Sequence, residues 1–187
     1  MGMAVPIYYS ADMVRALPED GNRYETVHGE LLVTPAPRAV HQHVVTELVL
    51  RIGNYLVLHP VGRVLISPAD ISWRQDVLVQ PDVFVVAMEE AITFDWARMK
   101  TLLLAIEVLS PSTRRYDRFT KRRVYQEFHV PCYGMVDIEG RAAEVWTPDA
   151  TFPTLERERL LWHPEGASEA LVIPLADILP PSSMPAS

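Results

Sequence analysis

Residues 102–128 read LLLAIEVLSPSTRRYDRFTKRRVYQEF, and this stretch decides the fold. Its apolar part, residues 102–109, ends at Ser110-Pro111 and is short enough and β-branched enough to be a buried strand. Glu107 interrupts the apolar run, and an ionised carboxylate inside a buried strand is costly unless a cation or hydrogen-bond donors compensate it. The stretch therefore predicts a positively charged partner close to Glu107.

The second half of the stretch, residues 116–128, predicts a helix that packs back on the strand. One stripe of this helix, at spacings of three and four, holds Asp117, Lys121, Val124, Tyr125 and Phe128. We expect Asp117 and Lys121 to face the end of the Glu107 strand and the arginines to face solvent. Lys100 and Lys121 are the two lysines of the chain, and Lys121 has the better position for a titratable amine.

Length and composition predict one soluble domain. The chain has 187 residues, of which 49% are hydrophobic, enough for a real core without covalent staples. Cys132 is the single cysteine, which excludes an intrachain disulfide and a multi-cysteine zinc site. His41 and His43 are two residues apart, so a helix would splay their rings, and we reject zinc. The N-terminus lacks a signal-peptide layout and no apolar run reaches membrane-spanning length, so we expect a cytoplasmic location.

The net charge of −7 argues against the broad basic surface of a nonspecific nucleic-acid binder. The charge is uneven, however: residues 111–130 carry six basic and two acidic side chains, which gives +4 next to Glu107. A solvated helix face would explain this cluster without any function, and contact with an acidic ligand would explain it as well.

Periodicity and turn residues predict the remaining elements. We expect a short helix over 11–17 capped by Ser10, a hairpin around His28-Gly29, and a long helix over 41–58. Further along, we expect a strand pair around Ser67-Pro68 within 62–73, a strand over 83–86 that Asp82 opens, and strands over 132–137 and 142–146. The proline-rich tail from 148 adds weaker strand signals near 157–161 and 170–173.

Several motifs, in this order, resemble the Uma-two family of putative restriction endonucleases, within the PD-(D/E)XK nuclease superfamily. They are Arg23-Tyr24-Glu25, Gly29-Glu30-Leu31, residues 37–41, Gln80-Pro81-Asp82, residues 107–113, Asp117 with Lys121, and residues 130–137. The resemblance implies an α/β (α+β) restriction-endonuclease-like fold, a mixed central sheet flanked by helices, with Asp82 and Glu107 on its middle strands. We expect a single domain over 1–187, with its core at about 10–147 and a C-terminal extension over 148–187.

The activity that the resemblance implies is metal-dependent hydrolysis of phosphodiester bonds. Asp82 and Glu107, with the Val108 carbonyl, would hold Mg²⁺ or Mn²⁺, because hard cations prefer oxygen ligands. Lys121 would position the attacking water or stabilise the transition state. The chain departs from the superfamily at Leu109, where a lysine is usual, and Lys121 on the following helix is the replacement.

Other residues have weaker claims. Glu30, His41 and Asp117 are supporting candidates. Taken alone, His41 is better explained as a residue that caps or precedes the long helix without a chemical role, and Glu30 has the same ambiguity. Asp117 can simply pair with Lys121. Nucleic acid, expected to be DNA, would contact Arg114, Arg115, Arg118 and Arg122, and the resemblance implies a homodimer. The alternative is a non-catalytic oligomeric module that keeps the nuclease fold and a structural ion-pair cluster.

Overall fold

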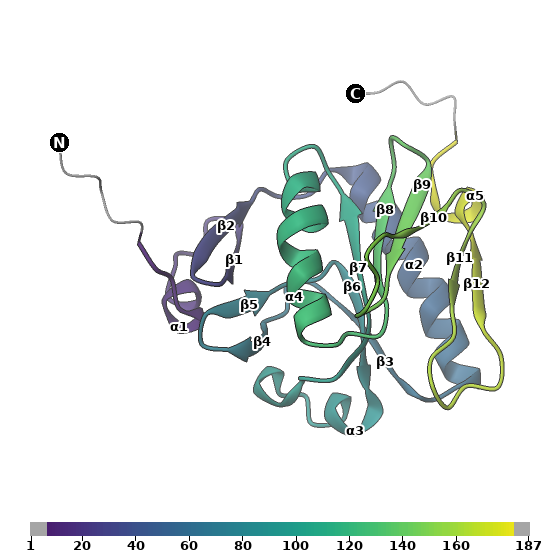
Figure 1. Ribbon diagram of the computed structural model, residues 1–187, viewed down its shortest axis with the longest axis horizontal. Coiled ribbons are helices and arrows are strands. Elements are labelled where there is room, and N and C mark those ends of the chain that lie inside the picture. Colours follow the sequence, from purple (N-terminus) through teal and green to yellow (C-terminus); the bar gives the residue numbers. More distant parts are fainter. Residues whose placement is uncertain (1–6, 182–187) are drawn as a thin grey trace.

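A six-stranded mixed sheet forms the centre of the computed structural model, which describes residues 7–181. Its strand order is β10-β9-β8-β7-β6-β3, in which β7 and β8 are parallel and the other pairs are antiparallel. The strands are β3 (Gly62–Ile66), β6 (Val83–Ala87), β7 (Leu102–Leu109), β8 (Tyr133–Asp137), β9 (Ala142–Trp146) and β10 (Thr154–Glu156). Helices flank both faces (Figure 1), which confirms the predicted fold class.

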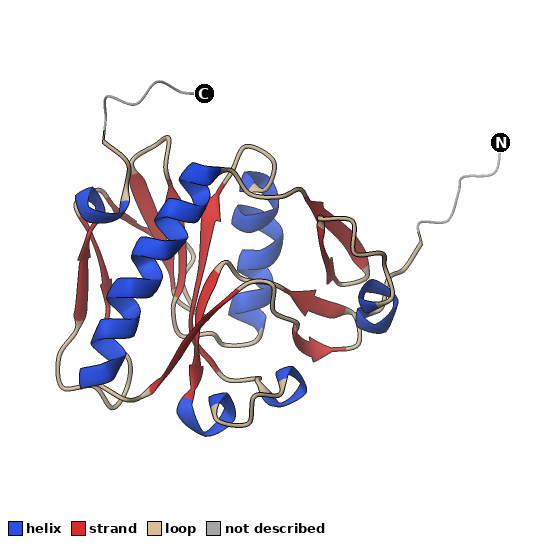
Figure 2. Cartoon of the chain, turned by 180° about the vertical axis from the view of Figure 1, so that it is seen from behind, coloured by secondary structure: helices blue, strands red, loops and turns tan. Residues whose placement is uncertain are grey.

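Two helices cover opposite faces of this sheet, as the views from front and back show (Figures 1 and 2). The long helix α2 (Ala39–Leu58) packs Leu48 and Ile52 on one face, against Val83 and Val85 of β6. On the other face lies α4 (Arg122–Glu127), whose Tyr125 packs in a cluster with Phe84 and Val86. Successive β6 residues therefore serve opposite faces, as the two-residue period of a strand requires.

The helix expected over 116–128 is not α-helical throughout. Residues Tyr116–Lys121 form a π-helical segment, η2, and α4 continues from Arg122. At the junction the Arg122 N–H donates to the Asp117 carbonyl, five residues earlier in the chain. Side-chain periodicity does not distinguish this wider turn from an α-turn, and such turns occur often at functional sites.

A smaller antiparallel sheet, β2-β1-β5-β4, packs beside the large one. It consists of β1 (Arg23–Val27), β2 (Glu30–Thr34), β4 (Ile71–Arg74) and β5 (Val77–Val79), and α1 (Ala11–Arg15) lies against it with Ser10 as its N-cap. The predicted hairpin turns at His28 and Gly29, both with positive φ, at 51° and 81°. Such a pair of left-handed residues suits a two-residue hairpin turn.

The strand pair predicted within residues 62–73 is wrong in its pairing. Both strands exist, but β3 pairs with β6 in the large sheet and β4 pairs with β5 in the small sheet. The alternation of apolar residues identifies a strand, whereas its partner is chosen by long-range packing. The segment between β3 and β4 thus links the two sheets.

The C-terminal residues complete the α2 face. Strands β11 (Arg159–Trp162) and β12 (Leu171–Pro174) pair with each other, and α5 (Leu175–Ile178) follows them. Buried side chains of these elements, among them Trp162 and Ile178, join the same apolar cluster as α2. The remaining segments are α3 (Met88–Ala91) and the 3₁₀ turn η1 (Trp96–Arg98). None of the helices in residues 7–181 is long and apolar enough to cross a membrane.

Candidate active site

Asp82 and Glu107 lie opposite each other on neighbouring central strands. Asp82 immediately precedes β6, and Val83 pairs with Ile106 of β7, so the antiparallel register sets Asp82 across from Glu107. Both side chains are buried, with 4% and 1% of their residue surface exposed. The element order predicted this adjacency, and the two carboxylates face the α4 side of the sheet, Asp82 just before β6 and Glu107 near the end of β7.

Lys121 supplies the cation that the sequence requires near Glu107. Its ammonium Nζ lies 3.1 Å from Glu107 Oε1, 2.9 Å from Glu25 Oε2 and 3.4 Å from Asp117 Oδ1. Only 2% of Lys121 is exposed. Tyr125, one turn further along, donates its hydroxyl hydrogen to Glu107 Oε1 at 3.2 Å. The ammonium is thus shared by three buried carboxylates.

Glu25 is the member of this cluster that sequence reasoning missed. It lies on β1 in the small sheet and is fully buried, and its Oε1 accepts a hydrogen bond of 2.6 Å from the Gln80 backbone N–H. The signal available was its place in the Arg23-Tyr24-Glu25 motif at the start of the predicted hairpin. Glu30, by contrast, is exposed at the start of β2, outside the cluster.

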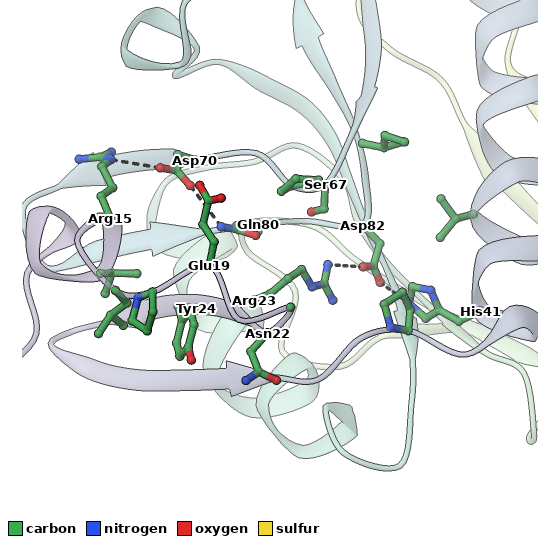
Figure 3. Close-up of a pocket in the computed structure, with 18 of the residues that line it drawn as sticks. Arg15, Glu19, Asn22, Arg23, Tyr24, His41, Ser67, Asp70, Gln80 and Asp82 are labelled. Carbon is green, nitrogen blue, oxygen red and sulfur yellow. Dashed lines mark hydrogen bonds and ion pairs between the residues drawn. The ribbon is translucent and has the colours of Figure 1, made fainter.

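Asp82 is held by three donors, two of which Figure 3 shows. Its Oδ1 accepts a hydrogen bond of 2.7 Å from Arg23 Nη1. Its Oδ2 contacts His41 Nε2, in the first turn of α2, at 3.0 Å and the Val108 backbone N–H at 2.9 Å. The His41 side chain therefore points into the site, and Val108 contacts Asp82 through its backbone N–H. Because an ionised carboxylate only accepts, His41 Nε2 carries the hydrogen.

The pKa values of the buried carboxyl groups are shifted in opposite directions. Burial would raise the pKa of Asp82, but the His41 hydrogen bond and the Arg23 charge outweigh burial and hold it below its usual value. Burial raises the pKa of Glu107 well above its usual value, because the Lys121 charge offsets burial only in part. Burial likewise raises the pKa of Asp117 to about 6. Pairs of carboxylates whose pKa values are pushed apart are typical of acid–base sites.

Lys121 keeps its proton in this arrangement. Burial alone would lower its pKa, but the charges of Glu107, Glu25 and Asp117 outweigh burial and raise the pKa well above the usual value. Lys121 is therefore a fixed cation beside Glu107 and can stabilise negative charge, whereas it has no tendency to accept a proton.

Two cavities meet at the Arg23–Asp82–His41 bridge. The larger, about 740 Å³, opens between the small sheet and α2, and Asn22, Gln80 and Asp82 are among its lining residues (Figure 3). The smaller, about 310 Å³, is lined by the hydroxyl-bearing residues Ser110, Ser112 and Thr113 among others. Arg23 and His41 line both cavities. An extended ligand that filled both would contact Arg23 and His41, the two side chains that hold Asp82.

The donor chemistry of the site fits a hard divalent cation. Four buried carboxylates, those of Glu25, Asp82, Glu107 and Asp117, face two permanent cations, Arg23 and Lys121. Burial, and to a smaller extent the neighbouring carboxylates, raise the pKa of Glu107. Asp82 and Glu107 could hold Mg²⁺ or Mn²⁺ through their oxygens, and the ion would supply further positive charge. Within residues 7–181, no group of three or more His, Cys, Asp or Glu side chains is arranged as a ready metal cage.

The arginines of the basic cluster do not all face solvent, contrary to the expectation. Arg114 pairs with Asp137 at 3.0 Å and Glu139 at 2.9 Å, and Arg118 pairs with Asp137 at 3.3 Å and Glu144 at 2.7 Å. Arg122 lies over the Trp146 ring, 4.5 Å from its centroid. Strands β8 and β9, which pack beside η2, bring these partners from distant sequence. Arg115 is exposed.

Comparisons with known proteins agree with this architecture. The family model Uma2, described as "Putative restriction endonuclease", matches residues 11–176. The crystal structure of a putative nuclease belonging to DUF820, from Anabaena variabilis, is similar at a TM-score of 0.70 and 20% sequence identity. The similarity covers 91% of this chain and 97% of that one, and at this identity it concerns the fold. A comparison with curated proteins returned no match.

Proposed function

Because the chain belongs to the Uma2 family, whose description is putative restriction endonuclease, we propose that it is a metal-dependent endonuclease acting on nucleic acid, specifically DNA. The observation that carries this proposal is the placement of Asp82 and Glu107 on neighbouring strands, with the Lys121 ammonium 3.1 Å from Glu107. Two carboxylates can hold a divalent cation, and a lysine beside them can stabilise negative charge, which together support metal-assisted phosphodiester hydrolysis.

Each residue has a distinct role in the proposed mechanism. Asp82 and Glu107 would hold Mg²⁺ or Mn²⁺ beside the Val108 backbone, and the bound ion would acidify a water and neutralise charge on the scissile phosphate. Lys121 retains its proton and stabilises negative charge that develops next to Glu107. Glu25 and Asp117 position the Lys121 ammonium, and Tyr125 donates a hydrogen bond to the same Glu107 oxygen that Lys121 contacts.

Recognition of nucleic acid would combine the cavities with the basic cluster. Arg114, Arg115, Arg118 and Arg122 remain the proposed contacts, and their charges favour a phosphate backbone. Since Arg114 and Arg118 already pair with carboxylates, we expect exposed Arg115 to contribute most. Cleavage of both strands of a duplex would need two such sites, so we propose a homodimer, which light scattering at micromolar concentration can check.

The test combines metal binding with cleavage. Calorimetric titration with Mn²⁺ and a plasmid assay with Mn²⁺ or Mg²⁺ are run on wild type, Asp82→Ala and Lys121→Ala. We expect Asp82→Ala to lose both metal binding and cleavage. Lys121→Ala should keep metal binding and lose about two or more orders of magnitude in cleavage rate, because a transition-state charge contact is removed.

Lys100→Ala is the matched control, because Lys100 is the other lysine of the chain and lies on the surface, where it bonds the Ser72 carbonyl. It should cleave like wild type, and circular dichroism verifies that every variant is folded. Equal cleavage by Lys121→Ala and wild type would contradict the assigned role of Lys121. A wild-type protein that binds neither metal and cleaves no nucleic acid would favour the non-catalytic module.

A further inference from the structure

Arg23 occupies the carboxylate oxygen that a metal ion at Asp82 would use. Its Nη1 lies 2.7 Å from Asp82 Oδ1, while Oδ2 is engaged by His41 and the Val108 N–H. Every oxygen of Asp82 therefore has a donor. A divalent ion on Oδ1 would lie close to the guanidinium, and like charges at that separation repel each other, so the two cations compete for this oxygen.

The Arg23 side chain is only partly satisfied where it lies. Its Nε is buried without a hydrogen-bond partner among the described residues, and so is His41 Nδ1. A buried donor without a partner costs free energy, so the guanidinium is not locked in place by a complete set of hydrogen bonds. Arg23 comes from β1 of the small sheet, and Asp82 from the large sheet, so the contact joins two layers.

There is space for the guanidinium to leave Asp82. Arg23 lines both the cavity of about 740 Å³ and the cavity of about 310 Å³, so open space adjoins its side chain on both sides of the bridge. Asn22 and Gln80 line the larger cavity, and serine and threonine hydroxyls line the smaller one, so both offer polar surroundings for a guanidinium.

We propose that Arg23 is a built-in substitute for the metal ion: it neutralises Asp82 in the metal-free protein and is expelled from Oδ1 when a divalent cation binds. This inference rests on the proposed metal site at Asp82 and Glu107. The metal-free protein thereby avoids an unpaired buried carboxylate, and metal affinity is reduced by competition with the guanidinium. Arg23 positions Asp82 in one state and is released toward the ligand cavities in the other.

The first experiment measures Mn²⁺ affinity by calorimetry in wild type, Arg23→Gln and Arg15→Gln. Arg15→Gln is the matched control, because Arg15 lines the same cavity but pairs with Asp12 and Asp70. We expect Arg23→Gln to bind Mn²⁺ about tenfold or more tightly than wild type, since a charge-assisted competitor is removed. Arg15→Gln should change the affinity less than about twofold.

The outcomes separate the competition from other effects. Unchanged or weaker Mn²⁺ binding by folded Arg23→Gln overturns the inference, because a merely structural Arg23 would not tighten binding when lost. An equal gain in Arg15→Gln also overturns it, since the effect would then be general charge repulsion. Absence of Mn²⁺ binding in wild type and in both variants refutes the metal site itself, and the inference with it.

A second measurement on wild type covers the case in which Arg23→Gln does not fold. A crystal structure of the wild-type protein with Mn²⁺ should show the ion on Asp82 and Arg23 Nη1 beyond hydrogen-bonding distance of Oδ1. An ion on Asp82 with the Arg23 contact intact at 2.7 Å would contradict the proposal.

Discussion

The two faces of the six-stranded sheet are built from the same strands but are held together differently. On the α2 face, Val83, Val85 and Ile106 pack against Leu48 and Ile52 in a cluster of apolar residues. On the α4 face the alternating positions of the same strands end in Asp82 and Glu107, which Arg23 and Lys121 compensate.

This difference separates two kinds of stability. The α2 face depends on apolar burial, which is insensitive to pH and to ligands. The charged end of the α4 face depends on the balance between buried charges, so protonation or a bound cation changes it. A functional site can therefore occupy one face of a sheet while apolar packing on the other face stabilises the fold.

The largest effect should follow loss of the central cation. Lys121→Met leaves Glu25, Glu107 and Asp117 without their shared partner, and breaking a buried ion pair costs about 3–5 kcal/mol of unfolding free energy. Urea denaturation at pH 7 measures this cost. It should be smaller at pH 5, where the carboxylates can take up protons, and a loss below about 1 kcal/mol would refute the central role of Lys121.

The matching change on the α2 face is Leu48→Ala, at a fully buried position. Removal of three methylene-sized groups from a packed core should cost about 2–5 kcal/mol. Because no charge is involved, the cost should be the same at pH 5 and pH 7, and Mn²⁺ affinity of the folded protein should not change. If urea denaturation showed that the loss of unfolding free energy in Leu48→Ala depends on pH, the proposed difference between the two faces would be contradicted.

A smaller effect concerns the pH dependence that Asp117 imposes. Its pKa is about 6 in the native protein, above the ordinary value of 3.8, so the native state binds a proton that the unfolded chain has already released. Between these values the unfolding free energy contributed by Asp117 falls as pH rises, by at most about 1.4 kcal/mol per pH unit. In Asp117→Asn this contribution disappears. Urea denaturation of wild type and Asp117→Asn from pH 4 to pH 7 would show the difference. If the unfolding free energy changed with pH at the same slope in both proteins, the prediction would be refuted.

The smallest effect is expected at the surface of the same face. Arg118→Gln removes contacts with Asp137 and Glu144, but 29% of the Arg118 side chain is exposed. Exposed pairs contribute about 1 kcal/mol or less, and salt weakens them further. Thermal unfolding at low and high salt measures this contribution. A loss as large as that of Lys121→Met would mean that the charged cluster extends to the surface of η2.

The sequence by itself determined the local features of this protein. Glu107 inside an apolar strand required a cation, and the helical spacing of Asp117 and Lys121 set both on the stripe that packs on the sheet. The order of the elements predicted a mixed sheet with Asp82 and Glu107 on its middle strands, and the structure has that sheet. Strand and helix periods fix which face a side chain occupies, and both can be read from neighbouring residues.

Only the tertiary structure decided which distant segments meet at that face. Glu25 and Arg23 reach the site because the small sheet packs over the end of the large one, and His41 reaches it from the start of α2. The pairing of β3 with β6 and of Arg118 with Glu144 was decided in the same way. No periodicity encodes these contacts, because they depend on how separate elements bury one another's surfaces, which is a property of the whole chain.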